Sequence, residues 1–545
     1  MANSKSNTVV NPADSKRAID GTKLFLIIFA VIALIGIITA AVFGVIAVAG
    51  KRTLDYEKAR LSKYISIDPS EYKSFDVLLN LDRLVDDEGN DTEYFKLAVQ
   101  NEILKLLYSN RKATDNKNKI GQTVKAGDTA NIYYYGYTLD EDGKKVPFSG
   151  GSNFSDKVTS LGIGSGSMIV GFELALVGKN SNDYRTMTKH TEGTVQDGQL
   201  VTITYTAAYF DGGVEKDATT TVDLSEDVDA KWGEGFKDYL LGATIGATIS
   251  ENLTVDRTGS DGITRTDVYS SVKVVSAIEF SEGEPLTIDV TFPRPYSSAD
   301  LEGKAVKFDI YIVTSVSYDT PEFNDGFITE TLGVKAEDLA EYGDENSSLT
   351  EKYTEKIRAD LLEEHRLEVN SLIETEMWEY YHRIVKVRKL PKAEVKLFYD
   401  NYEAEINNYY SQYSSYYSSF DQAARDYLQI GSTADWQEAL TEKAEQAVTE
   451  KLIFYYIARN EGLMPDEQTK GVIYDELFDE MLDAYLEQYQ VDRDNYDTEE
   501  EYNKQVEYYK SVILTQYGED YITENALFEY IMDTLVTYAN IKYAE

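Results

Sequence analysis

Three kinds of hydrophobic pattern follow one another along the chain. An uncharged apolar run spans 24–49, alternating polar and apolar positions recur between about 121 and 316, and apolar residues at helical spacing fill 317–545. Alternation predicts strands, and a spacing of three to four residues predicts helices. We therefore expect an α+β multidomain protein, in which an N-terminal apolar helix precedes an antiparallel sheet region with a short helix and a C-terminal all-α region.

The apolar run is longer than the ~20 residues that a helix needs to cross a bilayer. It predicts a transmembrane signal-anchor over 23–50, behind a short polar tail at 1–22. A cleaved signal peptide is the alternative, because Ala47-Val48-Ala49 has the small-x-small form of a cleavage site. Signal h-regions usually have about 7–15 residues, so the length favours the anchor.

Basic residues flank the apolar run on both sides, so charge leaves its orientation open. Large domains translocate largely regardless of charge. We expect a single-pass protein of the cell membrane whose large C-terminal region is extracytoplasmic.

Helical periodicity divides the C-terminal region into successive helices. The first spans about 349–387, and the next begins after Pro391, a residue that suits the first turn of a helix. Further helices are predicted over 436–457, 465–486, 502–514 and 525–543. An earlier amphipathic helix is predicted over 94–107.

Tyrosine is unusually frequent, with 43 residues, and four tyrosines follow helical spacing after Pro391: Tyr402, Tyr409, Tyr413 and Tyr416. Either they pack between helices, or they form a partly exposed surface that binds unfolded chains, since Tyr combines apolar area with a polar tip. Interleaved Asn, Ser and Gln residues argue against a dry core. Both interpretations stay open, and the second makes these four tyrosines a client-binding site.

A glycine-rich turn at 161–167 leads into a short apolar helix that is expected to start near Met168 and to close at Gly178. Met168, Ile169 and Phe172 have the spacing that places side chains on one helix face. The pattern indicates either a helix packed on a sheet or the floor of an apolar pocket.

This stretch resembles the signature of FKBP-type peptidyl-prolyl isomerases, in the form found in trigger factor. Segments that resemble the family's first long strand, its F-x-G-G step and its closing strands occur in the same order: Gly127–Gly136, Phe148–Gly151, Leu286–Pro293 and Gly303–Phe308. The helices after 317 resemble the arm-bearing chaperone domain of trigger factor.

The resemblance implies a juxtamembrane support segment at 51–120, an isomerase domain built from 121–180 and 281–316, and a helical chaperone domain at 317–545. The insertion at 181–280 looks like a degenerate copy of the isomerase unit, because Gly198–Tyr205 and Gly235–Gly242 repeat two of its segments. It lacks the glycine-rich turn, so its pocket is expected to be lost. An unrelated small β domain is the alternative.

The resemblance assigns a prolyl-peptide pocket with Phe172 as its floor. The residues implied to form its walls and helix edge are Tyr134, Phe148, Tyr296, Phe308, Met168 and Ile169. The backbone N–H of Ile169 is implied to face a substrate carbonyl. Ser149 and Thr159 depart from the family, which carries an acid and often an aromatic residue there, so slow or broad activity is expected. The alternative is that these side chains are ordinary core.

Composition narrows the function. A net charge of −42 argues against nucleic-acid binding, which needs basic patches. The absence of Cys and the presence of only three His residues, scattered along the chain, argue against thiolate, metal or triad chemistry, and no cofactor is expected.

Together these features predict a membrane-anchored extracytoplasmic foldase that isomerises prolyl peptides and holds unfolded or nascent exported polypeptides without ATP. Ribosome binding is not expected, since 53–120 carries no docking loop. A non-enzymatic chaperone or surface-binding protein that uses the FKBP fold as a scaffold is the alternative.

Overall fold

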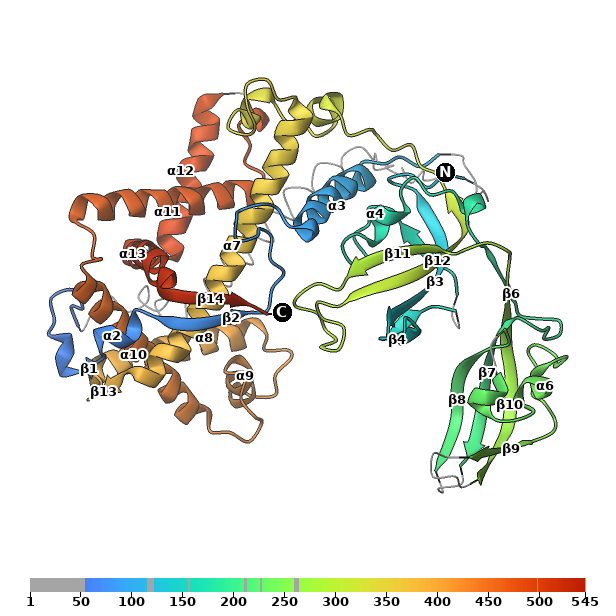
Figure 1. Cartoon of the computed structure of the whole chain (residues 1–545). Coiled ribbons are helices and arrows are strands. Elements are labelled where there is room, and N and C mark those ends of the chain that lie inside the picture. The colour runs from blue at the N-terminus through green and yellow to red at the C-terminus, as the bar shows by residue number, and fades with distance from the viewer. Residues whose placement is uncertain are drawn as a thin grey trace, which may run out of the picture. The chain divides into compact units, whose positions relative to one another are not determined.

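The computed structural model describes residues 54–114, 122–154, 157–209, 213–225, 228–258, 264–496 and 498–544. The chain forms two compact units, one made of residues up to Leu79 with His365–Lys542, the other of Asn80–Glu364 with the last few residues. Figure 1 shows the elements of both, most of them with labels. The expected α+β composition is confirmed: within the described ranges, both sheets of more than two strands lie in the second unit, and most helices lie in the first.

The first sheet of the second unit has the strand order β11-β12-β3-β4, with β5 also paired to β3, and every pairing is antiparallel. Its strands are β3 (Thr129–Leu139), β4 (Lys145–Ser152), β5 (Thr159–Gly162), β11 (Leu286–Thr291) and β12 (Ala305–Val316). Strict alternation of buried and exposed residues along β11 turns one face of the sheet to a core.

Two helices accompany this sheet. The predicted helix at 94–107 is confirmed as α3 (Glu93–Ser109), and the short helix is α4 (Phe172–Leu176). The start of α4 differs from the prediction, which placed it near Met168. Gly171 precedes the helix with φ of +89°, a left-handed conformation that ends any helix running through it. Phe172 and Leu176 of α4 are buried in the same core as the inward residues of β11 and β12.

A second sheet forms from residues 187–280, in the order β6-β10-β7-β8, with β9 also paired to β10. Its elements are β6 (Met187–His190), β7 (Leu200–Ala208), β8 (Val214–Asp223), α5 (Val228–Trp232), α6 (Phe236–Leu240), β9 (Leu253–Thr258) and β10 (Thr264–Phe280). The two sheets share a plan: β7 lies between β8 and β10 as β3 lies between β4 and β12. Both short helices follow a left-handed glycine, Gly171 in one and Gly235 in the other.

The first unit is mainly helical. Its elements are β1 (Ile65–Ser66), α2 (Pro69–Tyr72), β2 (Phe75–Leu79), the C-terminal part of α7 (Leu349–Ile384), β13 (Lys386–Val387), α8 (Lys392–Gln412), α9 (Phe420–Tyr427), α10 (Trp436–Glu461), α11 (Glu467–Gln488), α12 (Glu499–Gln516), α13 (Glu519–Leu535) and β14 (Ala539–Tyr543). Two small sheets, β1–β13 and β2–β14, join N-terminal segments to this half of the chain. Residues 54–79 therefore belong with the helices, although they were expected to support the sheet region.

Three predicted helices extend beyond the observed ones. The first was expected to reach about 387, but α7 ends at Ile384 and β13 follows it. The helix after Pro391 ends at Gln412, so Tyr413 and Tyr416 lie beyond it. The helix predicted over 525–543 is wrong at its end, because α13 stops at Leu535 and Ala539–Tyr543 forms β14. β14 exists because β2, far away in the sequence, offers a pairing edge, and local periodicity cannot show that.

No helix in the described ranges has the length and apolar character needed to cross a bilayer. The polar tail at 1–22 and the predicted signal-anchor at 23–50 lie outside the described residues, so the anchor stays a prediction.

Candidate active site

The aromatic residues assigned to the pocket form one connected cluster against the first sheet. Phe308 of β12 is its centre: its ring centroid lies 5.2 Å from that of Phe172, 6.0 Å from Tyr134 and 5.8 Å from Phe148, all in edge-to-face arrangements. Tyr296 joins through Phe292, at 4.7 Å between centroids. Edge-to-face pairs at these distances are favourable beyond their buried area.

Burial divides this cluster into a floor and a rim. Phe172 is fully buried and Phe308 is 5% exposed. Tyr134, Phe148, Met168, Ile169 and Tyr296 are all partly exposed and pack against the same core. The structure thus brings together all seven residues that the resemblance assigned, with apolar side chains reaching the surface around a buried aromatic base.

Gly136 makes room for this packing. A Cβ at this position would lie 2.5 Å from the ring of Phe308 and 2.7 Å from that of Phe148. Both distances are shorter than any tolerable contact, so the two rings can approach β3 only because position 136 carries no side chain.

The glycine-rich turn is held by Glu173, a residue that the sequence analysis did not single out. Glu173 is 1% exposed, and its carboxylate accepts four backbone N–H groups: Gly164 at 2.7 Å, Ser167 at 3.0 Å, and Gly166 and Met168 at 3.3 Å. The hydroxyls of Ser165 and Ser167 also donate to it, at 3.0 and 3.3 Å. A buried carboxylate is stable only when it is satisfied in this way.

Helix α3 supports the other side of the turn. A Cβ on Gly164 would lie 2.4 Å from the carbonyl oxygen of Leu104, and one on Gly162 would meet the ring of Tyr108 at 2.5 Å. Gly164 also has φ of +108°. The turn is therefore glycine-rich because it passes directly over a helix, while Glu173 fixes it from inside.

Met168 and Ile169 follow this fixed turn and precede α4. Within the part of the chain that the structure describes, the backbone N–H of Ile169 donates to no protein group, so it is free to meet a ligand carbonyl. The site offers apolar contact and a backbone donor. In the described ranges, no group of three or more His, Asp or Glu side chains is placed to hold a metal ion.

Ser149 and Thr159, the two residues that depart from the family pattern, lie in different surroundings. Ser149 is exposed on β4. The hydroxyl of Thr159 accepts from the side chain of Asn153 at 2.9 Å, and Asn153 also bonds the backbone of Ile132 and Tyr134. Thr159 therefore helps to tie β5 and the loop before it to β3.

The second sheet carries an equivalent but covered cluster. Tyr269 pairs with Ala207 as Phe308 pairs with Gly136, and its ring lies 5.1 Å from Phe236 and 5.6 Å from Tyr205. Trp232 stacks on Phe236 at 5.0 Å.

Trp232 precedes Phe236 by four residues, as Met168 precedes Phe172. The indole therefore occupies the place of the first sheet's rim and covers the floor. Phe236 and Tyr269 are fully buried and Tyr205 is 6% exposed. Trp232 was not among the residues predicted from the sequence, although its four-residue offset from Phe236 can be read there.

The tyrosines proposed as a client-binding stripe do not form one surface. Tyr402 is 1% exposed and packs in the helical core, which corrects its assignment to an exposed stripe. Tyr409 and Tyr417 share the carboxylate of Asp426 through their hydroxyls. Tyr413 and Tyr416, beyond the end of α8, are 38% and 80% exposed.

No protein-family model matches the chain. Among curated proteins it is similar to the trigger factors of Ligilactobacillus salivarius, with 26% identity over 212 residues, and of Halothermothrix orenii, with 27% over 214 residues. Each alignment covers 38% of this chain, and 42% and 45% of the respective relative, so the chain spans less than half the length of these proteins.

A shorter match, 44% identical over 61 residues, is to the trigger factor of Aliivibrio fischeri. A solved structure of a trigger factor chaperone, described for promiscuous substrate recognition in folding and assembly activities, aligns with 64% of this chain at 13% identity and covers 63% of its own chain. Its TM-score of 0.21 is too low to support an argument about fold. By sequence, the chain is thus similar to trigger factor chaperones over part of its length.

Proposed function

We propose that this protein is a membrane-anchored foldase that combines FKBP-type prolyl isomerisation with an ATP-independent holdase activity. The proposed substrates are unfolded or nascent exported polypeptides. The observation that carries the proposal is the convergence of Tyr134, Phe148, Met168, Ile169, Phe172, Tyr296 and Phe308 around one buried aromatic base. The partial similarity to trigger factors supports it.

The proposed mechanism needs no proton transfer. Rotation about a prolyl bond must cross a barrier of about 18–20 kcal/mol, which arises from amide resonance. The twisted amide has less charge separation than the planar one, so an apolar aromatic site favours it over the hydrated ground state. Phe172 and Phe308 provide that surface, and the N–H of Ile169 orients the substrate chain by donating a hydrogen bond to a substrate carbonyl.

Proline-limited refolding of a model protein tests the enzyme directly. Phe172→Ala and Tyr134→Ala are expected to remove most of the acceleration given by the wild type. A buried Phe→Ala change costs about 3–5 kcal/mol, so circular dichroism must show that the variants remain folded. Phe236→Ala and Tyr205→Ala, in the second sheet, are the matched controls and should alter stability alone. If the wild-type protein does not accelerate proline-limited refolding, the proposed isomerase activity is refuted.

In that event the second candidate function, a non-enzymatic chaperone built on the same scaffold, would remain. The aromatic cluster under Trp232 favours this second function, because it shows the same arrangement of aromatic residues serving as covered core and not as an accessible site.

The holdase part rests on exposed aromatic surface in the helical unit. After the correction of Tyr402, the proposed client-binding residues are Tyr409, Tyr413 and Tyr416. Full-length protein should suppress aggregation of an unfolded test protein without ATP. Changing the three tyrosines to Ser should weaken suppression and leave the far-UV spectrum intact. Melting of the protein by this change would instead assign them to packing.

The proposed location is the cell membrane, with the region after Arg52 outside the cytoplasm. The apolar run at 24–49 supports this part of the proposal. Protease added to intact cells should digest the C-terminal region. Its full protection would contradict an extracytoplasmic location.

A further inference from the structure

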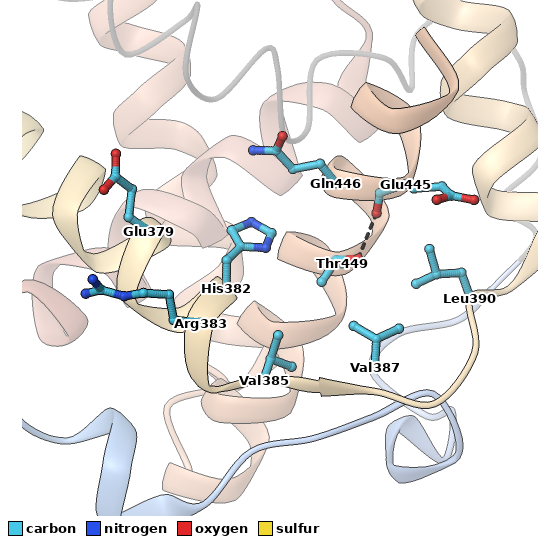
Figure 2. A pocket seen from close by; sticks show the side chains of 9 residues that line it. All are labelled: Glu379, His382, Arg383, Val385, Val387, Leu390, Glu445, Gln446 and Thr449. Carbon is cyan, nitrogen blue, oxygen red and sulfur yellow. Dashed lines mark hydrogen bonds between the residues drawn. The ribbon is translucent and has the colours of Figure 1, made fainter. Parts of the chain in front are cut away.

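A groove lies in the helical unit, between the segment that links α7 to α8 and one face of α10. One hollow of about 660 Å³ is shown in Figure 2: α7 contributes Glu379, His382 and Arg383, the linking segment Val385, Val387 and Leu390, and α10 Glu445, Gln446 and Thr449. A second hollow, of about 650 Å³, continues along α8 and shares Leu390 and Glu445 with the first. We call the two together the basic groove. Each volume lies in the range of ligand-binding pockets.

The floor of the basic groove is apolar and accessible. Val385 and Leu390 are partly exposed, and Val387 is 47% exposed. In Figure 2 the three side chains line the edge opposite α10. Val385 and Val387 are two residues apart along an extended segment, so they share a face, while Lys386 points the other way.

The lining of the groove carries an excess of positive charge, although the protein as a whole is strongly acidic. Four cationic side chains line the two hollows, Arg383, Lys389, Lys392 and Lys396, whereas the protein has a net charge of −42. Glu394, which lies between them in the sequence, is 2% exposed and accepts the hydroxyl of Tyr56 at 3.0 Å. Among the described residues, Arg383, Lys389 and Lys392 form no ion pair, and all three are exposed.

Three carboxylates also line the groove. Asp400 is paired with Lys396 at 2.7 Å, and Glu379 and Glu445 are exposed on opposite walls. Among the described residues, none of these carboxylates forms an ion pair with Arg383, Lys389 or Lys392. An occupant that brings its own acidic groups to that side would neutralise them.

We infer that the basic groove binds extended polypeptide segments in which apolar side chains are flanked by Asp or Glu. The inference rests on the chaperone part of the proposed function and names the client chemistry that part would select. Apolar client residues cover Val385, Val387 and Leu390, and flanking carboxylates meet Arg383, Lys389 and Lys392. Elsewhere the acidic surface repels such segments, so this groove is where they bind.

Fluorescence anisotropy with full-length protein tests the inference. The probe is a short labelled peptide with a Leu/Val core and Asp/Glu flanks, and the matched probe has Lys flanks around the same core. At low salt we expect the acidic probe to bind at least about fivefold more tightly than the basic probe. At high salt the difference in affinity should be smaller, because salt screens exposed charges.

Lys389→Gln with Lys392→Gln should remove most of the preference for the acidic probe. Lys504→Gln with Lys510→Gln, in α12, is the matched control and should leave that preference unchanged. Val387→Ser should weaken the binding of both probes. Val472→Ser, a control at a valine of similar exposure (49%), should weaken the binding of neither.

Equal binding of the two probes, or groove variants that behave like their controls, would overturn the inference. Stronger, Lys389-dependent binding to vesicles of phosphatidylcholine with phosphatidylglycerol than to the acidic peptide would also overturn it, in favour of a lipid surface. Aggregation assays separate this failure from that of the proposed function. If full-length protein suppresses aggregation while the groove variants bind as wild type, only the groove assignment fails.

Discussion

The role of Glu173 can be tested by the exchange of one heavy atom. Glu173→Gln keeps the volume of the side chain but replaces one carboxylate oxygen with an NH₂ donor. Both oxygens of Glu173 are used: one accepts from Gly164 and Gly166, the other from Ser165, Ser167 and Met168. Whichever way the amide is turned, its donor faces other donors.

The cost follows from the burial of these donors. Gly166 and Ser167 are exposed, so water can replace their lost acceptor, but Gly164 is buried against α3. Hydrogen bonds to charged groups contribute about 1.5–3 kcal/mol each, and an unsatisfied buried donor costs about as much. We expect Glu173→Gln to destabilise the glycine-rich turn by about 2–3 kcal/mol.

Hydrogen exchange followed by mass spectrometry measures the stability of the turn itself. A local measurement is needed because a chain of two units need not unfold in a single transition. Peptides that cover 161–171 should exchange about 30- to 150-fold faster in the variant, since about 1.4 kcal/mol corresponds to a factor of ten. Ser165→Ala removes one hydroxyl donor to Glu173 and a long contact, 3.4 Å, in which the Ser165 hydroxyl accepts the N–H of Ser167. That N–H keeps Glu173 as its acceptor at 3.0 Å, so Ser165→Ala should change exchange much less. Exchange in Glu173→Gln within about threefold of wild type would refute the view that the carboxylate holds the turn.

Three further predictions concern other parts of the chain. Met168→Trp should copy the arrangement of Trp232 and cover Phe172, which would lower any acceleration of proline-limited refolding without a loss of thermal stability. Lys451→Met should lower the free energy of unfolding in urea by about 3–5 kcal/mol, because it removes the 2.9 Å ion-pair partner of Glu524, whose side chain is 4% exposed. The double variant Lys451→Met with Glu524→Leu should regain most of that free energy. Equal losses in the single and the double variant would contradict this reasoning. Burial, aided by Glu529 and Asp533, raises the pKa of Glu374 to about 7 from 4.5. The folded state then holds a proton that the unfolded state releases, so stability falls as pH rises from about 4.5 to 7, and Glu374→Gln should gain about 1 kcal/mol at pH 8 and nothing at pH 4, after allowance for partial exposure.

That the seven candidate site residues lie together could be predicted, because each motif is short and its neighbours fix its geometry. The alternation along β11 and the fixed pairing of β12 with β3 bring Phe308 and Tyr134 to one face. Glu173 was missed because an acid between Phe172 and Leu174 reads as an exposed residue on a short helix. Its signal is the preceding run of glycines and serines, whose N–H groups need an acceptor.

The client-binding stripe shows the limit of periodicity. Helical spacing correctly relates Tyr402 to Phe398 and Ile406, but it cannot say which face meets another helix. Tyr402 is buried beside α10, where Lys443 lies over its ring. Helix α8 ends at Gln412, so Tyr413 and Tyr416 lie beyond it and are not packed in the core. The spacing of these tyrosines does not indicate where the helix ends.

The two sheets together show what separates an accessible aromatic site from a filled one. Both floors are aromatic, with Phe236 in the place of Phe172 and Tyr269 in the place of Phe308, and the sheets differ more at the positions that border the floor. Gly136 becomes Ala207, Met168 becomes Trp232, and Glu173 becomes Lys237. Lys237 cannot accept N–H groups, and it binds Asp197 and the carbonyl of Leu224 instead.

Without an acceptor to hold a glycine-rich turn over the floor, the second sheet has a short helix there, and its last residue, Trp232, covers Phe236. The floor aromatics are therefore a property of the fold, shared by both sheets. The glycine-rich turn and its buried acid are what leave the first sheet's floor bordered by partly exposed side chains, and for this reason Glu173, more than Phe172, distinguishes the candidate site from core.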